Sequence, residues 1–195
     1  MESNNRYICV YGASSDNIAE EYKQEAYLLG KTLAAKGWNC INGAGSAGLM
    51  RAVSDGFLDA GAKAVGIIPQ FMVDNGWHYT RLSQIIATPD MHHRKQLMAQ
   101  RSECSIAMPG GCGTLEELLE IITWKQLSLY NKPIVIFNIN GFFDSLLQQL
   151  EHCINQQFMK STHKQLWYTA NSVQQIVHYI DNYDHQAAPT VESKY

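Results

Sequence analysis

The sequence lacks the features that mark membrane, secreted and polyanion-binding proteins. No apolar run among its 195 residues is long enough to cross a bilayer. Its polar first six residues lack the charged and then apolar layout of a secretion signal. Lys and Arg number 15 against 18 Asp and Glu, and they form no dense stripe interleaved with aromatic residues. We therefore expect a cytoplasmic protein that has neither a nucleic acid nor a membrane as its partner.

The cysteines and histidines form no pattern typical of a disulfide framework or a metal site. The five cysteines are odd in number and widely spaced, without a Cys-x-x-Cys pair, at positions 9, 40, 104, 112 and 153. The adjacent His92 and His93 would diverge on a helix, and no third ligand has a suitable spacing. We expect reduced thiols, most of them buried on strands, and no metal.

Short apolar runs alternate with longer helical patterns along the chain, which is 46% hydrophobic and 17% charged. The runs predict strands at 6–11, 38–42, 64–68, 82–88, 104–108 and 133–138, with a short edge strand at 165–169. The helical patterns lie at 17–36, 47–60, 91–102, 113–129, 142–157 and 172–182, and segment 69–81 is expected to be a loop. Ser15 or Asp16 should cap the first helix and Asp90 the third. Such alternation predicts an α/β fold, a mostly parallel sheet with helices on both faces. We expect one domain over residues 1–182 and a flexible tail at 183–195.

Three turns rich in small residues follow predicted strands. They are Gly12–Ser15, Gly43–Gly48 and Pro109–Gly113. Ligands of parallel sheets bind at the carboxyl ends of the strands, so the three turns could line one crevice. Ser14 and Gly45 are therefore candidate binding residues.

The turn Gly43–Gly48 matches the G-x-G-x-x-G pattern, which alone is a weak signal. A dinucleotide site would place it after the first strand, with an acid at the end of the next one. Here the turn follows the second strand, and the next strand ends without an acid. The pattern favours a phosphate- or ribose-binding turn, or a structural turn, over an NAD or FAD site.

The segment Pro109–Glu117 is the most informative part of the chain. Its glycines, Gly110, Gly111 and Gly113, allow close backbone approach at the start of a predicted helix, whose free N–H groups attract anions. Thr114 and Glu117 also fit a helix capping box, which would explain them without a ligand. No Lys-Ser/Thr follows the last glycine, so the segment is not a nucleotide triphosphate loop. Together with the acids that follow, the turn suggests chemistry on a phosphorylated substrate.

Arg94 occupies an unusual position for a charged residue. It follows Met91 by three residues and precedes Met98 by four, so it lies on what looks like a buried helix face. A buried charge needs a partner. A structural ion pair, a ligand phosphate or a carboxylate from the glycine turn could supply it. The neighbouring Lys95 would be a second cation or plain surface.

These motifs resemble those of the Lonely guy (LOG) family. Pro109–Glu117 resembles the family's P-G-G-x-G-T-x-x-E signature, and Met91–Lys95 is similar to its M-H-x-R-K element. Gly45–Met50 resembles its G-x-x-G-L-M segment, and Ile121–Leu127 followed by Asn131–Ile134 also fits. The resemblance covers residues 6–160 of the chain.

The resemblance implies a Rossmann-like homodimer without a cofactor. The implied substrate is a nucleoside monophosphate, a cytokinin riboside 5′-monophosphate, which is split into free base and ribose 5-phosphate. Arg94 and Glu117 carry over as the catalytic pair. The implied substrate-binding positions are Lys95, Gly111, Cys112, Gly113, Thr114, Leu115, Glu116 and Thr123, to which the phosphate turn adds Gly110. Many members of the family have been labelled lysine decarboxylases. The sequence does not support that activity, because no pyridoxal-phosphate site is recognisable in it.

Two alternative functions stay open. A general AMP or purine nucleotide nucleosidase would share every motif, and a carrier that binds a nucleotide or cofactor without turnover would use the same fold.

Two departures from the family's motifs also matter. Its three consecutive glycines read Gly43-Ala44-Gly45 here, and the loop Met72–His78 lacks a Glu that contacts the base in many members. We expect Trp77 or Asp74 to substitute, by stacking or hydrogen bonding.

Overall fold

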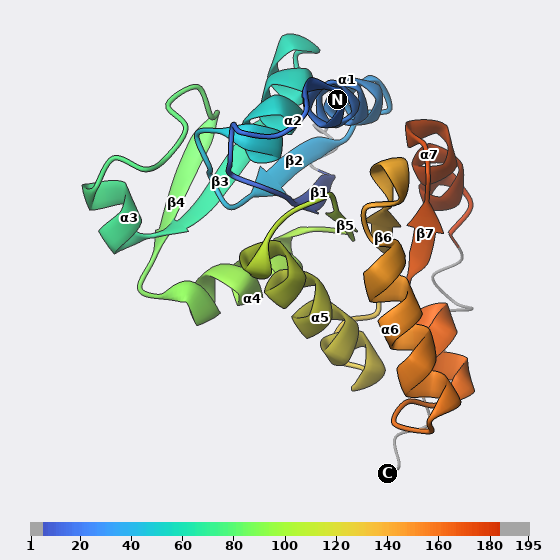
Figure 1. Ribbon diagram of the computed structural model, residues 1–195. Coiled ribbons are helices and arrows are strands. Elements are labelled where there is room, and N and C mark those ends of the chain that lie inside the picture. The colour runs from blue at the N-terminus through green and yellow to red at the C-terminus, as the bar shows by residue number, and fades with distance from the viewer. Residues whose placement is uncertain (1–5, 184–195) are drawn as a thin grey trace.

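A seven-stranded sheet forms the middle layer of the computed structural model, which describes residues 6–183 (Figure 1). The strand order is β4-β3-β2-β1-β5-β6-β7, and every pairing is parallel. The strands are β1 (Tyr7–Tyr11), β2 (Asn39–Asn42), β3 (Ala64–Pro69), β4 (Gln84–Thr88), β5 (Cys104–Ala107), β6 (Ile134–Phe137) and β7 (Tyr168–Ala170). The expected α/β fold is confirmed, and the sheet is fully parallel.

Helices cover both faces of the sheet (Figure 1). They are α1 (Glu20–Ala35), α2 (Gly48–Asp59), α3 (Gln70–Asp74), α4 (Met91–Arg101), α5 (Cys112–Gln126), α6 (Asp144–Asn155) and α7 (Val173–Asp181), with 3₁₀ turns η1 (Ile139–Gly141) and η2 (Ser161–Leu166). One core packs α1, α2 and α7 on the sheet, and the other packs α4, α5 and α6 on the opposite face. Within residues 6–183, none of these helices is both long and apolar enough to cross a membrane.

Strand β1 shows why the apolar runs are nearly continuous. Ile8 and Val10 point into one core, whereas Cys9 and Tyr11 point into the other, and all four are at most 3% exposed. Successive side chains of a strand alternate between its faces, so a strand covered on both sides needs apolar residues throughout. Three of the five free cysteines are buried on strands, as expected, at positions 9, 40 and 104.

The strand order reverses beside β1, and this reversal brings the small-residue turns together. The chain runs outward from β1 to β4 and then crosses back to β5, on the other side of β1. Ala13 N–H donates to Pro109 O at 3.0 Å, and Leu49 N–H donates to Ala13 O at 2.9 Å. The turn after β1 is thus bonded both to the turn after β5 and to the start of α2. Parallel sheets bind ligands at such a reversal.

The helices differ from the predictions most clearly at α1 and α3. Helix α1 begins at Glu20, three residues late, without a side-chain cap. Asp16 instead accepts a hydrogen bond from Gly48 N–H at 2.9 Å, so it serves the start of α2. The expected loop 69–81 contains the short helix α3. The Asp90 cap of α4 is confirmed, since Asp90 Oδ1 accepts from His93 N–H at 2.8 Å.

The capping-box interpretation of Thr114 and Glu117 is wrong. Helix α5 begins at Cys112, inside the glycine turn, and its N-cap residue Gly111 makes no side-chain cap. Thr114 therefore lies within the first turn of the helix instead of before it. Of the expected tail 183–195, only Tyr183 belongs to the described residues, and its ring packs edge-on against Tyr179 at 5.6 Å. Residues 184–195 lie outside them.

Candidate functional site

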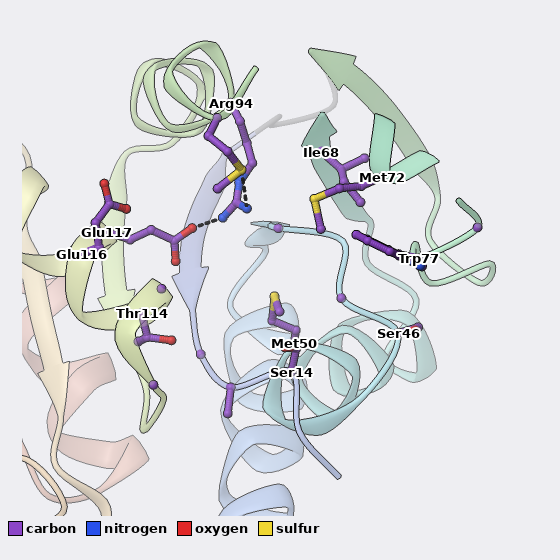
Figure 2. Close-up of a pocket in the computed structure, with 18 residues that line it drawn as sticks. Ser14, Ser46, Met50, Ile68, Met72, Trp77, Arg94, Thr114, Glu116 and Glu117 are labelled. Atoms are coloured by element: carbon purple, nitrogen blue, oxygen red, sulfur yellow. Dashed lines mark hydrogen bonds and ion pairs between the residues drawn. The ribbon is translucent and has the colours of Figure 1, made fainter. Parts of the chain in front are cut away.

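A cleft of about 560 Å³ opens over the carboxyl ends of β1, β2 and β5. All three small-residue turns contribute to its lining, as expected from their positions after parallel strands. Helices α4 and α5 add Arg94, Thr114, Glu116 and Glu117 from one side (Figure 2). The cleft therefore combines backbone-lined turns with charged side chains from two helices.

Arg94 and Glu117 form a buried ion pair in the wall of this cleft. The guanidinium Nη2 donates to Glu117 Oε1, and each residue is 8% exposed (Figure 2). Burial lowers the pKa of Arg94, because the charged form is poorly solvated there. Of the alternatives for Arg94, the observed partner is the carboxylate that follows the glycine turn. Arg94 Nε is buried without a hydrogen-bond partner in the described part of the chain.

The sequence around Arg94 explains its placement. The Asp90 cap fixes the start of α4, so Arg94 lies one turn along the helix. Met98 is fully buried below it, and Nη1 of Arg94 lies 3.7 Å from Met91 Sδ. On the side of β2, a Cβ on Gly43 would stand 3.0 Å from Nη2 of Arg94. The glycine after β2 thus leaves room for the guanidinium.

The departure Gly43-Ala44-Gly45 has a visible consequence in the backbone. Ala44 adopts φ 64°, in the left-handed region that favours glycine. Its N–H donates to Asn42 Oδ1 at 2.9 Å, which helps to hold this conformation. Alanine in this region costs about 1 kcal/mol relative to glycine, so the turn tolerates the substitution at a modest loss.

The glycines of the 109–113 turn divide into two kinds. A Cβ on Gly110 would stand 2.1 Å from Thr114 Oγ1, so packing alone requires glycine there. A Cβ on Gly111 or Gly113 would meet no described atom within 4 Å, and both glycines line the cleft. Their missing side chains keep open the space in front of the N-terminus of α5. Free N–H groups at a helix start favour an anion in such a space.

Lys95 does not reach the cleft. Its ammonium donates to Glu116 and, at 3.1 Å, to Glu120, and its side chain is 9% exposed. Burial alone would lower the pKa of Lys95, but the two carboxylates outweigh it and raise the pKa. Glu116 lines the cleft, so Lys95 orients a residue of the site from behind.

The structure brings together most, though not all, of the predicted site residues. Those that line the cleft are Ser14, Gly45, Arg94, Gly111, Gly113, Thr114, Glu116 and Glu117. Gly110 packs against Thr114 within the turn and does not line the cleft. The Cys112 side chain is exposed, and Leu115 packs on the core under α5. Thr123 lies two turns further along α5, exposed, with its hydroxyl donating to Leu119 O at 2.8 Å.

Trp77, one of the two side chains expected to contact the base, lines an apolar part of the cleft whose other members the sequence did not predict. Met50, Ile68 and Met91 line it, together with Met72 and Trp77 from the loop that departs from the family pattern. Asp74, the other candidate from that loop, instead accepts a hydrogen bond from Gln70 and does not line the cleft. Apolar residues next to strand ends resemble ordinary core residues in the sequence, so Met50 and Ile68 were not predicted to line a cleft.

The fold and the cleft define an α/β protein with a ligand-sized cleft at the reversal of its parallel sheet, where the start of α5 suits an anion. The model of the family described as "Possible lysine decarboxylase" matches residues 50–180. LOG5, a cytokinin riboside 5′-monophosphate phosphoribohydrolase of Arabidopsis thaliana, is 36% identical over 94% of this chain and 80% of its own length. LOG3 and LOG1 of the same plant are 36% and 35% identical over 94% of this chain and 85% and 86% of their own lengths. The chain belongs to the LOG family.

Solved structures of more distant proteins share the fold. A molybdenum cofactor binding protein from Rippkaea orientalis superposes with a TM-score of 0.71 at 22% identity, covering 91% of this chain and 96% of that one. The molybdenum cofactor carrier protein of Chlamydomonas reinhardtii gives a TM-score of 0.68 at 22% identity, with the same coverage. At this identity, the similarity supports the fold alone.

Proposed function

We propose that this chain hydrolyses the N-glycosidic bond of a nucleoside 5′-monophosphate, with a cytokinin riboside 5′-monophosphate as the substrate its LOG relatives indicate. The products are the free base and ribose 5-phosphate. The observation that carries the proposal is the buried Arg94–Glu117 pair beside a glycine turn that opens a helix. The turn suits a phosphate, and the carboxylate lies in the same cleft.

Each part of the cleft has a role in this reaction. The N-terminus of α5 and the Thr114 hydroxyl hold the 5′-phosphate. As the bond to the base breaks, positive charge develops on the ribose, and the Glu117 carboxylate stabilises it or activates the attacking water. Water supplies the hydroxyl at the sugar carbon, and its other proton, passed directly or through the Glu117 carboxylate, ends on the nitrogen of the departing base. Arg94 holds Glu117 in its ionised form and in position.

The lysine decarboxylase description of the family fits this cleft poorly. A pyridoxal-phosphate enzyme holds its cofactor through a lysine Schiff base. The described residues that line the cleft include no lysine. The nearby Lys95 is already bonded to Glu116 and Glu120.

Of the two alternative functions, only the carrier would make different demands on the site. A carrier without turnover would need the phosphate turn, but binding gives no reason to bury Arg94 against Glu117 in the cleft wall. A general purine nucleotide nucleosidase would use the same residues, and only its choice of substrate would differ.

We further propose that the chain acts as a homodimer in the cytoplasm. Leu119 of α5 and Leu127, the residue that caps the end of this helix, flank Thr123 at four-residue spacing, and they are 39% and 53% exposed. An exposed apolar stripe of this kind suits a protein contact, which would let a partner's Thr123 approach a second site. Free cysteines suit a reducing compartment. Light scattering of the purified protein tests the dimer.

A substrate panel tests the proposed reaction. The protein is incubated with AMP, GMP, CMP and isopentenyl-AMP, and both free base and ribose 5-phosphate are measured. We expect equal amounts of the two products, with faster release from isopentenyl-AMP than from AMP. Equal rates from these two would favour the general nucleosidase, and no release from any of the four would favour the carrier.

A further inference from the structure

The cleft has two chemically different sides (Figure 2). Its charged groups, Arg94, Glu116 and Glu117, come from α4 and α5. On the opposite side lie Ile68, Met72 and Trp77. No charged side chain lines that second side within the described residues. A ligand with a phosphorylated sugar at one end, its phosphate at the start of α5, and an apolar, planar group at the other end would match both sides.

Trp77 is the largest apolar group in the lining. It is 53% exposed, whereas Trp38, another indole of the chain, is 3% exposed. Ligand-binding pockets are lined mainly by apolar and aromatic side chains, so an open indole in this cleft suits a binding surface. An indole offers a flat surface on which a nucleobase can stack, whatever the base's hydrogen-bonding edge.

The backbone fixes Trp77 in relation to the glycine turn after β2. Its N–H donates to Met72 O at 3.1 Å, which holds it against the end of α3. The next residue, His78, forms an isolated antiparallel bridge with Gly45. Tyr79 N–H then donates to Ala44 O at 2.9 Å. The segment is therefore pinned to the same turn that packs against Arg94.

Trp77 also has side-chain support from its own segment. Phe71 of α3 meets it edge to face, with ring centroids 6.3 Å apart and planes at 84°. Tyr79, two residues on, anchors the segment to α2 through a hydrogen bond from its hydroxyl to Asp55 Oδ1 at 2.6 Å. An aromatic group held in this way loses little conformational entropy when a ligand binds.

We infer that Trp77 is the base-stacking residue of the cleft and that it determines specificity for the size of the base. The inference rests on the proposed function for the nature of the ligand, a nucleoside monophosphate. With the phosphate at the N-terminus of α5, the base lies toward the opposite side, between Trp77 and the thioethers of Met50 and Met72. Methionine side chains adapt to flat and irregular groups. A two-ring purine covers more of the indole than a one-ring pyrimidine does, so purines bind more tightly.

Kinetics of two Trp77 variants test the inference. We expect Trp77→Ala to raise KM for AMP by roughly tenfold, the size of one lost base–aromatic stack, with kcat changed less than about twofold. Trp77→Phe should keep most of the affinity. Phe158→Ala removes an aromatic side chain that is 85% exposed and does not line the cleft, and it should change neither constant. The preference for AMP over CMP should shrink in Trp77→Ala and persist in Phe158→Ala.

Intrinsic fluorescence gives a readout that does not need turnover. AMP added to a Glu117→Gln variant should quench indole emission, and ribose 5-phosphate, which lacks a base, should not. The quenching should disappear in Trp77→Phe/Glu117→Gln, although calorimetry still detects AMP binding. If Glu117→Gln does not fold, the same titration uses the wild-type protein with short mixing times.

The outcomes separate this inference from the proposed function. AMP that quenches Trp77 emission without being hydrolysed by the wild type would overturn the proposed reaction and support the base-stacking role. Hydrolysis with an unchanged KM in Trp77→Ala, and quenching that persists in Trp77→Phe, would overturn the base-stacking role and leave the reaction standing.

Discussion

Arg94 of α4 and Glu117 of α5 form a buried ion pair in the wall of the cleft, where the strand order of the sheet reverses beside β1. Both are 8% exposed, so neither charge can rely on water for solvation. Removing one member of a buried pair leaves the other uncompensated, and this costs more than the pair contributes as a whole. A change at either residue should therefore lower the stability of the fold as well as alter the cleft.

A double-mutant cycle on this pair tests that coupling. We expect Arg94→Gln and Glu117→Gln each to lower the free energy of unfolding by about 3 kcal/mol, because each leaves one buried charge. The double variant should lose less than the sum of the two. Urea denaturation of the four proteins gives the coupling energy. Additive losses would mean that the two side chains do not interact in solution.

The glycines of the 109–113 turn should respond differently to substitution by alanine. A Cβ added at Gly111 or Gly113 would meet no atom of the described residues within 4 Å. Both alanine variants should therefore fold, with an unchanged or slightly raised midpoint of urea unfolding. With the phosphate at this turn, as proposed, the added methyl groups would crowd it, so KM should rise by about tenfold or more, the cost of one displaced contact. Gly110→Ala is the contrasting control, since it clashes with Thr114 and should lower stability. Unchanged KM values for both cleft variants would place the phosphate elsewhere.

Lys95 offers a test between a binding role and a positioning role. Lys95→Met removes the partner of Glu116 and Glu120, and we expect a loss of about 1–3 kcal/mol in unfolding free energy. The fall in kcat/KM should be smaller than for Arg94→Gln. Lys164→Met breaks an exposed pair with Glu151 and serves as the control, with almost no effect on stability. A large rise in KM at unchanged stability would instead mean that Lys95 contacts the substrate, as the family resemblance implies.

Lys125 should make stability depend on pH. It is buried in α5, where its ammonium donates to Lys132 O at 2.8 Å, and burial lowers its pKa to about 8 from 10.5. Between these values the unfolded chain binds a proton that the folded chain has released, so stability rises with pH. Relative to Lys125→Met, the wild type should gain on the order of 1–3 kcal/mol between pH 8 and pH 10. Urea unfolding of both proteins across this range measures the difference, and a constant difference would contradict the lowered pKa.

Much of the fold follows from the sequence because the strands are apolar throughout. Alternation of such runs with helical patterns predicted every strand of the sheet, including β7 at the edge. Helix starts were predicted less well. Asp16 looks like a cap for the helix that follows it, but its carboxylate reaches the backbone of Gly48, which no local pattern reveals.

The charged half of the site was also predictable. Arg94 stands out because a cation on a methionine-lined face requires a partner, and the glycine turn supplies Glu117. The apolar half was harder to predict. Met50 and Ile68 follow the patterns of core residues, and only the tertiary arrangement of α2 and β3 brings them into the same cleft lining as Trp77.

The most direct test of the account compares Glu117→Gln with Glu120→Gln. Both changes neutralise one carboxylate on α5, but only Glu117 lines the cleft, whereas Glu120 pairs with Lys95 behind it. The measurement is release of free base and ribose 5-phosphate from AMP and isopentenyl-AMP at saturating substrate. We predict that Glu117→Gln lowers kcat by about 100-fold or more, the contribution of a positioned acid–base or electrostatic group, and that Glu120→Gln retains most of it. A folded Glu117→Gln protein that hydrolyses both nucleotides at the wild-type rate would contradict the account.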